Sequence, residues 1–451
     1  MYIVLILLLV FLLFVCYLAF DREILCPPVA AVAMFLFSSI FGLLRYWDWN
    51  MEEYSGLSVV LLMIGFFFYI STSYIVLLLF NKKQRYNIEP IVRDRIELNS
   101  FFLISLLGVA LIETNLFYRY VLLNAESSGF FESSLGLIIN FVRHMGNEYS
   151  DFEKIPMPFY LSFMDNVSRS FSIMFIFIII HNAIFQCLKK QEILMILFVL
   201  LYSVCHLLTG NRGVFLSIIS EILYLSYFFW NMKAGWTLRV NKIIFNLGLK
   251  IALFFFPLFV IMAVMLGRYG DVTNLSSYDI NPLDHLTIYI SSAVRNFDLF
   301  VQEPLIDNTL FGKETFYSVN RFLYNRFGIG YFYSPNLEFR SINGNNIGNI
   351  YTVFRRYYAD FGLEGLIFLP AFLGAFFSYL YNKAKYNAIN GKISYHMLLF
   401  SSLSTAIFYF PIDDIFFHFE FSINRFFSYV FLGIVFYFIL QTKDKTLLDK
   451  F

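Results

Sequence analysis

The sequence predicts an all-α protein that crosses a membrane about eleven times, within a range of ten to twelve. Of its 451 residues, 59% are hydrophobic and the mean hydropathy is +0.66. Apolar runs near twenty residues long recur along the chain, and about 20 residues of helix cross the ~30 Å hydrocarbon layer. Because these runs are continuous and do not alternate with polar residues, they favour helices over the strands of a membrane barrel.

Eleven spans are expected. The first is expected to be a membrane span and not a cleaved signal peptide, because it lacks a preceding basic segment and a small-residue cleavage motif. No internal repeat or Gly/Ser-rich linker divides the chain, so residues 1–451 are predicted to form one membrane domain. Two long outer loops are expected at 119–164, with an interfacial helix at 135–145, and at 268–360. The expected spans are 2–20, 24–44, 57–80, 100–118, 165–188, 193–209, 214–231, 247–267, 362–382, 394–411 and 425–441.

Lysines and arginines are distributed unequally across the predicted membrane. Thirteen of the fifteen lysines fall on one side, and thirteen of the eighteen arginines fall on the other. Positive loops tend to stay in the cytoplasm, so the lysines place the C-terminus inside and the N-terminus outside. The outer arginines run against this tendency. Because a guanidinium binds phosphate through two parallel hydrogen bonds, these arginines indicate an anionic ligand on the outer side.

The overall composition argues against several other classes of protein. A net charge of +1 gives no broad positive field, so no nucleic-acid partner is expected. The four cysteines lie in predicted spans at spacings unlike a zinc or redox motif. The six histidines are scattered, and no carboxylate pair in a soluble domain could clamp a nucleotide sugar through a cation. We therefore expect neither a metal nor another cofactor.

Two short turns place an arginine at the outer end of a span. Arg212 lies in the sequence Thr-Gly-Asn-Arg-Gly at 209–213, where backbone N–H groups and the start of the next span could hold a phosphate. An ordinary interhelical turn, whose arginine reaches lipid headgroups, explains the same pattern equally well. Arg268, in Gly-Arg-Tyr-Gly at 267–270, repeats the arrangement.

Further arginines accompany carboxylates in the large outer loop. Arg295 and Asp298 are three residues apart, so on a helix they share a face and could simply pair with each other, or belong to a site. Arg355, Arg356 and Asp360 lie in a tyrosine-rich stretch just before a span. Because adjacent helical residues point about 100° apart, only one of these two arginines is expected to face a shared site, while its neighbour meets solvent or headgroups.

The order of these motifs resembles the Wzy-type oligosaccharide repeat-unit (O-antigen) polymerases over roughly residues 200–385. The resemblance implies a metal-independent glycosyltransferase of the GT-C type in the bacterial inner membrane, joining undecaprenyl-diphosphate-linked units on the periplasmic face. It also implies a Wzz-type chain-length co-polymerase as partner. The segments that carry it are Gly210–Gly213, Phe297-Asp298, Phe311–Phe316, Asn349–Thr352 and Tyr358–Gly362, and the matching polar positions are Arg212, Arg295, Asp298, Arg355 and Asp360.

The expected chemistry needs cations for a diphosphate and a base for a sugar hydroxyl. The arginines Arg212, Arg268, Arg295, Arg355 and Arg356 would stabilise the leaving diphosphate. Asp298, Asp360 and His285 are the candidate bases, although a structural ion pair explains each carboxylate as well and a solvated loop explains the histidine. A lipid-linked glycan ligase would use the same arginine chemistry. A transporter or flippase should instead show internal repeats and polar residues near span centres.

Overall fold

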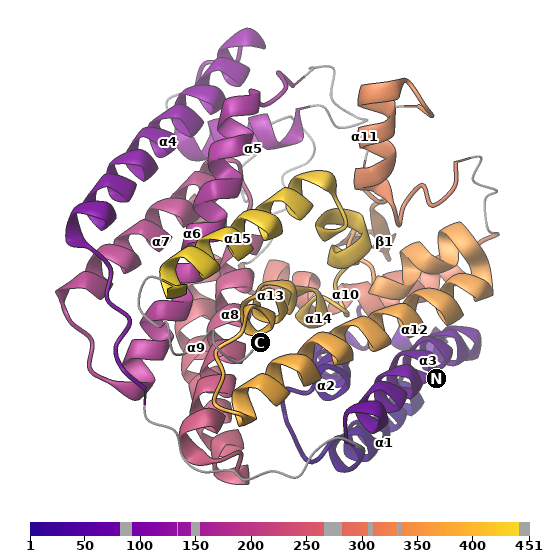
Figure 1. Ribbon diagram of the computed structural model, residues 1–451. Coiled ribbons are helices and arrows are strands. Elements are labelled where there is room, and N and C mark those ends of the chain that lie inside the picture. Colours follow the sequence, from indigo (N-terminus) through magenta and orange to yellow (C-terminus); the bar gives the residue numbers. More distant parts are fainter. Residues whose placement is uncertain are drawn as a thin grey trace. The chain divides into compact units, whose positions relative to one another are not determined.

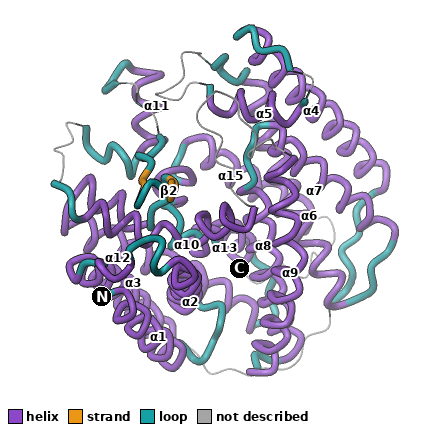
Figure 2. Tube along the Cα trace, turned by 180° about the vertical axis from the view of Figure 1, so that it is seen from behind, coloured by secondary structure: helices purple, strands orange, loops and turns teal. Residues whose placement is uncertain are grey.

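The computed structural model describes residues 1–81, 93–132, 134–145, 154–265, 282–304, 310–331, 333 and 335–441, and it is mostly helical (Figures 1 and 2). Within these ranges, ten helices are long and apolar enough to cross a membrane. The predicted class, a multi-pass helical membrane protein, is therefore confirmed. The ten are α1 (Tyr2–Ala19), α2 (Pro27–Gly42), α3 (Gly56–Asn81), α4 (Ser100–Ser127), α6 (Phe159–Phe185), α7 (Lys190–Leu208), α8 (Gly213–Ala234), α9 (Leu238–Met265), α12 (Val353–Ile389) and α15 (Ile423–Gln441).

The expected span at 394–411 is the one that differs. It is divided into α13 (Tyr395–Leu403) and α14 (Thr405–Phe408), and together these are shorter than a membrane span. The interruption falls at Ser404, the last residue of the sequence Ser-Ser-Leu-Ser. Serine hydroxyls compete with the helix for backbone hydrogen bonds, which explains why the apolar run does not form one continuous helix.

The shorter elements lie in the two long segments between spans. The interfacial helix expected at 135–145 is α5 (Leu135–His144). The described part of segment 268–360 contains α10 (Pro282–Val301), α11 (Tyr317–Phe327) and an antiparallel hairpin of β1 (Arg340–Ile342) and β2 (Asn345–Gly348), whose strands are orange in Figure 2. Asn343 and Gly344 both have positive φ in its turn, as this sequence favours in a tight hairpin. The remaining short helices are η1 (Leu43–Arg45), η2 (Met51–Glu53) and the π-helical turn η3 (Phe416–Glu420).

The chain forms two compact units, each built from separate stretches of sequence. The first unit comprises Met1–Asn87, Leu283–Tyr386 and Leu403–Ile423. In it, α1, α2, α3 and α12 lie side by side (Figure 1). A Cβ atom at Gly374 of α12 would lie 2.1 Å from the carbonyl oxygen of Tyr69, so glycine allows α12 to approach α3 closely.

The second unit comprises Ile88–Pro282, Asn387–Ser402 and Asn424–Phe451. Its packing is dominated by α4 against α7 and by α6 against α7 and α8. Helix α5 also packs on α4, where buried Ile138, Ile139 and Val142 join one apolar cluster with Phe117. The polar face of α5 ends in the exposed residues Arg143 and His144.

Candidate functional site

A break in helix α12 positions the arginine-rich segment of the first unit. Gly362 has φ 57° and ψ −140°, so residues 353–361 form a helical segment with a direction of its own. The left-handed φ favours glycine. A Cβ at Gly365 would lie 2.1 Å from the carbonyl oxygen of Tyr357, so this second glycine is needed for the chain to continue after the break. The break lies at residue 362, where the sequence predicts that a span begins.

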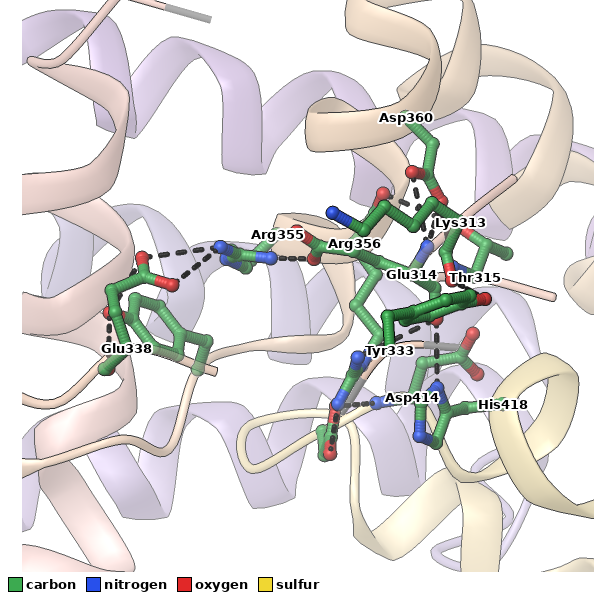
Figure 3. Close-up of polar contacts among 12 residues, drawn as sticks. Lys313, Glu314, Thr315, Tyr333, Glu338, Arg355, Arg356, Asp360, Asp414 and His418 are labelled. Atoms are coloured by element: carbon green, nitrogen blue, oxygen red, sulfur yellow. Dashed lines mark hydrogen bonds and ion pairs between the residues drawn. The ribbon is translucent and has the colours of Figure 1, made fainter. Parts of the chain in front are cut away.

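Arg355 is buried among aromatic rings and carboxylates (Figure 3). Its guanidinium carbon lies 4.3 Å from the ring centre of Phe300 and 5.0 Å from that of Tyr351. It donates to both carboxylate oxygens of Glu338, at 2.9 and 3.2 Å, and forms an ion pair with Glu314. The aromatic faces and the two carboxylates hold the positive charge in one place.

Glu338 connects Arg355 with a second arginine in the hairpin. Arg340 donates to Glu338 Oε1 at 3.0 Å, and the hydroxyl of Tyr351 donates to the same oxygen at 3.0 Å. Arg340 also pairs with Glu303, and this contact raises the pKa of Arg340 and lowers that of Glu303. The side chain of Glu338 is 41% exposed. A solvent-accessible carboxylate therefore lies between two guanidinium groups.

Arg356 makes a separate pair on another side of the helix. Its Nε and Nη2 donate to the two carboxylate oxygens of Asp413, at 2.6 and 2.9 Å. Arg355 and Arg356 are each only 3% exposed. The prediction that one of them would face solvent or headgroups is therefore wrong. The two arginines do point to different partners, as their spacing requires. Both are buried because segments 313–315, 338–340 and 410–418 cover this helix on more than one side.

Asp360 binds backbone amides. Its carboxylate accepts hydrogen bonds from the N–H of Thr315 at 2.7 Å and from the N–H of Glu314 at 3.0 Å. These bonds fix the segment that carries Glu314, the ion-pair partner of Arg355. Asp360 therefore has a positioning role in this site, and its role as a base stays a prediction.

Asp413 and Asp414 belong to the same cluster, although no sequence motif assigned them to it. Asp414 is buried, and its Oδ1 accepts from the N–H of Phe417 at 3.1 Å, at the start of the π-helical turn η3. Burial, together with the negative charge of Asp413, raises the pKa of Asp414 to about 8. For Asp413, burial favours the neutral acid, but the charge and hydrogen bonds of Arg356 outweigh it and the pKa is lowered.

His418 closes the same side of the cluster. Its Nδ1 lies 2.8 Å from the carbonyl oxygen of Glu314, to which it donates (Figure 3). Burial and, to a smaller extent, the positive charge of Arg356 hold the pKa of His418 well below its ordinary value. The imidazole is therefore neutral at pH 7, and this histidine supports the backbone around Glu314.

Arg295 and Asp298 form a buried ion pair on α10. This confirms the interpretation that the two residues, three apart on one helix face, pair with each other. Asp298 also accepts from the hydroxyl of Ser58 at 2.6 Å and from the N–H of Ser55 at 2.9 Å. Arg295 donates to the carbonyl oxygen of Trp49 at 3.0 Å. The pair fixes α10 to the start of α3, and the catalytic role of Asp298 stays a prediction.

The other predicted residues lie elsewhere. Arg212 is buried in the second unit, as the residue that precedes α8. The turn before it is held by the N–H groups of Thr209 and Asn211, which donate to the carbonyl oxygen of His206 at 3.1 and 3.0 Å. Arg268 lies outside the described residues. His285 belongs to α10, but its side chain is also outside the described part.

The structure thus gathers Arg355, Arg356 and Asp360 in one cluster of the first unit. Sequence reasoning missed Glu338 and Arg340. Their signal was weak: a charged Glu-Phe-Arg triplet just before an Asn-Gly turn. A scan against protein-family models and searches of the curated proteins and of the solved structures found no match.

Proposed function

We propose that the protein polymerises undecaprenyl-diphosphate-linked oligosaccharide repeat units on the outer face of a bacterial inner membrane. One observation carries the proposal: the accessible carboxylate of Glu338 lies between the guanidinium groups of Arg340 and Arg355. Two guanidiniums that share one anion provide the donors that a phosphate needs. A diphosphate that displaces Glu338 would meet both arginines and the hydroxyl of Tyr351, which also binds this carboxylate.

The reaction can be written for these side chains. The oxygen of an acceptor sugar hydroxyl forms a bond to the anomeric carbon of the growing chain. The bond from that carbon to the diphosphate breaks, and its electron pair leaves with the diphosphate, where Arg340 and Arg355 stabilise the charge. Glu338, released from the two arginines, accepts the proton of the hydroxyl. Of the carboxylates around Arg355, Glu338 is suited to this role because it is accessible and lies where the diphosphate would bind.

Helix α12 supports the proposed orientation. Arg355 lies at its start and Lys385 lies near its end, and the 24 residues from Gly362 to Lys385 would extend about 36 Å. This length exceeds the ~30 Å hydrocarbon layer. Since lysines favour the cytoplasmic side, the Arg355 cluster would then face outward. The proposal also places the N-terminus outside and the C-terminus inside, and includes a Wzz-type chain-length co-polymerase as partner.

The test is the glycan profile of a strain that lacks this chain and is complemented with variants. Arg355→Ala removes a donor that stabilises the leaving group, so we expect a ~10²–10³-fold loss of polymerisation. The surface glycan should collapse from a ladder to single repeat units. Arg355→Lys keeps the positive charge but loses the planar guanidinium with its parallel N–H donors. This variant should therefore produce only part of the wild-type ladder. Arg45→Ala, which removes a partly exposed arginine paired with Asp48, is the matched control.

The same experiment separates the alternatives. A normal ladder in Arg355→Ala, at equal protein level, would contradict the proposal. If the strain without the chain lacks even single repeat units on the final acceptor, the protein is a ligase. If lipid-linked units accumulate where an enzyme added outside cannot reach them, it is a flippase.

A further inference from the structure

Glu113 is a buried carboxyl inside a membrane-spanning helix of the second unit. It lies midway along α4 and is 1% exposed. The hydroxyl of Ser168, on α6, donates to its Oε2, while Oε1 has no hydrogen-bond partner. Among the residues that the structure describes, no lysine, arginine or histidine forms an ion pair with it. The carboxyl is therefore enclosed by the helical bundle without a cation.

An ionised carboxylate in this position would be costly. An isolated charge in an apolar interior carries a large desolvation penalty, and a bound proton removes it. Oε2 can accept from Ser168 in either protonation state, so burial without an ion-pair partner is what favours the neutral acid. The proton then belongs on Oε1, the atom without an acceptor role. A neutral carboxyl with one serine partner is thus the arrangement that the surroundings favour.

A second titratable pair lies one helical turn away. Asp165 precedes Ser168 by three residues on α6, so the two share a helix face. Its Oδ1 lies 3.2 Å from Nε2 of His206 on α7, and the two side chains are 20% and 12% exposed. Asp165 also interacts electrostatically with Glu113. A partly accessible acid–histidine pair therefore lies next to a fully buried carboxyl.

The other charged or titratable groups on the helices around Glu113 have roles of their own. Arg169 follows Ser168 on α6 and donates to the hydroxyl of Tyr429 at 3.1 Å. Cys205 of α7 contacts the hydroxyl of Thr114 at 3.3 Å. Helix α5 contributes Arg143 and His144, both exposed at its C-terminal end.

We propose that Glu113 and Ser168 form a proton-binding site inside the second unit. The ligand is the proton itself, and a monovalent cation such as Na⁺ is the rival occupant. The proposal does not depend on polymerase activity, because it concerns the second unit alone.

The test is an infrared difference spectrum of the full-length protein in lipid nanodiscs at pH 7. The spectrum of the wild type minus that of Glu113→Gln should contain the C=O stretch of a protonated carboxyl. Ser168→Ala should shift this band, because it removes the one hydrogen bond that the group receives from the described part of the chain. Glu126→Gln is the matched control: Glu126 lies on the same helix but is exposed, so its difference spectrum should contain carboxylate bands.

Carboxylate bands for Glu113 would overturn the proposal, and so would a protonated band that disappears when K⁺ is replaced by Na⁺. Thermal melting provides an independent measurement. Glutamine resembles the neutral acid in shape and in its lack of charge, so Glu113→Gln should leave the melting temperature unchanged. A large drop in this variant would show that the native group is charged, and would also overturn the proposal.

Discussion

Two buried sites, Arg355 with Arg356 in the first unit and Glu113 in the second, have different kinds of partner. In the first unit, Arg355 and Arg356 are almost fully enclosed, and each is matched by carboxylates at hydrogen-bond distance. In the second unit, Glu113 is equally enclosed, but its partner is a serine hydroxyl. An arginine cannot lose its proton in a protein, so it must be paired when it is buried, whereas a carboxyl can become neutral by binding a proton. The two residue types therefore indicate two kinds of site.

The difference also explains where an external anion can bind. The carboxylates around Arg355 are on loops and partly exposed, with side-chain exposures of 41% for Glu338 and 20% for Glu314. A ligand with stronger negative charge can displace such groups. Around Glu113 the described residues offer no cation that could hold an anion. Substrate binding thus fits the first unit, and proton binding fits the second.

The largest effect that the comparison predicts comes from breaking the Arg356–Asp413 pair. Arg356→Ala leaves the carboxylate of Asp413, whose side chain is 26% exposed, without its cation, which should reduce the free energy of unfolding by at most about 3–5 kcal/mol. The melting temperature of the purified protein measures this. The double variant Arg356→Ala with Asp413→Ala should recover part of the loss. An Arg356→Ala protein as stable as Glu113→Gln would mean that the two units do not differ in this way.

The next effect concerns catalysis by the first unit. Glu338→Gln keeps the shape of the side chain but removes the base, so we expect a ~10²-fold loss of polymerisation with lipid-diphosphate binding retained. Glu303→Gln is the matched control, since Glu303 also pairs with Arg340 but does not contact Arg355. Polymerisation and binding are measured on the same purified variants. If both glutamates behave alike, Glu338 acts only as an ion-pair partner.

Hydropathy predicted the spans well because burial in lipid is a property of local sequence. Ten of the eleven expected spans are helices of sufficient length. The partners of the arginines were not predictable in this way. Asp413 is 57 residues from Arg356 along the chain, and no local pattern encodes such a contact. Glu113 was missed because one carboxyl hardly changes the mean hydropathy of a long apolar helix.

The smallest predicted effect, taken per pH unit, is a pH dependence from Asp414. Burial and the charge of Asp413 raise the pKa of this carboxyl to about 8, whereas an unfolded aspartate titrates near pH 4. Between about pH 4 and pH 8 the folded state keeps a proton that the unfolded state has lost. Stability should therefore be highest at the acidic end and fall as the pH rises, by at most about 1.4 kcal/mol per pH unit.

Asp414→Asn should remove this contribution, because the amide does not titrate. Melting temperatures of the wild type and the variant, measured from pH 5 to 8, should therefore diverge, with the variant gaining relative stability toward pH 8. The neighbours of Asp414 determine how far its pKa is raised. The charge of Asp413 raises this pKa further, while Arg356 and the amide of Phe417 lower it. Parallel melting curves would show that Asp414 is already ionised at the acidic end. In that case the first unit would compensate every buried carboxylate with a cation or an amide, and neutralisation by a proton would be confined to Glu113.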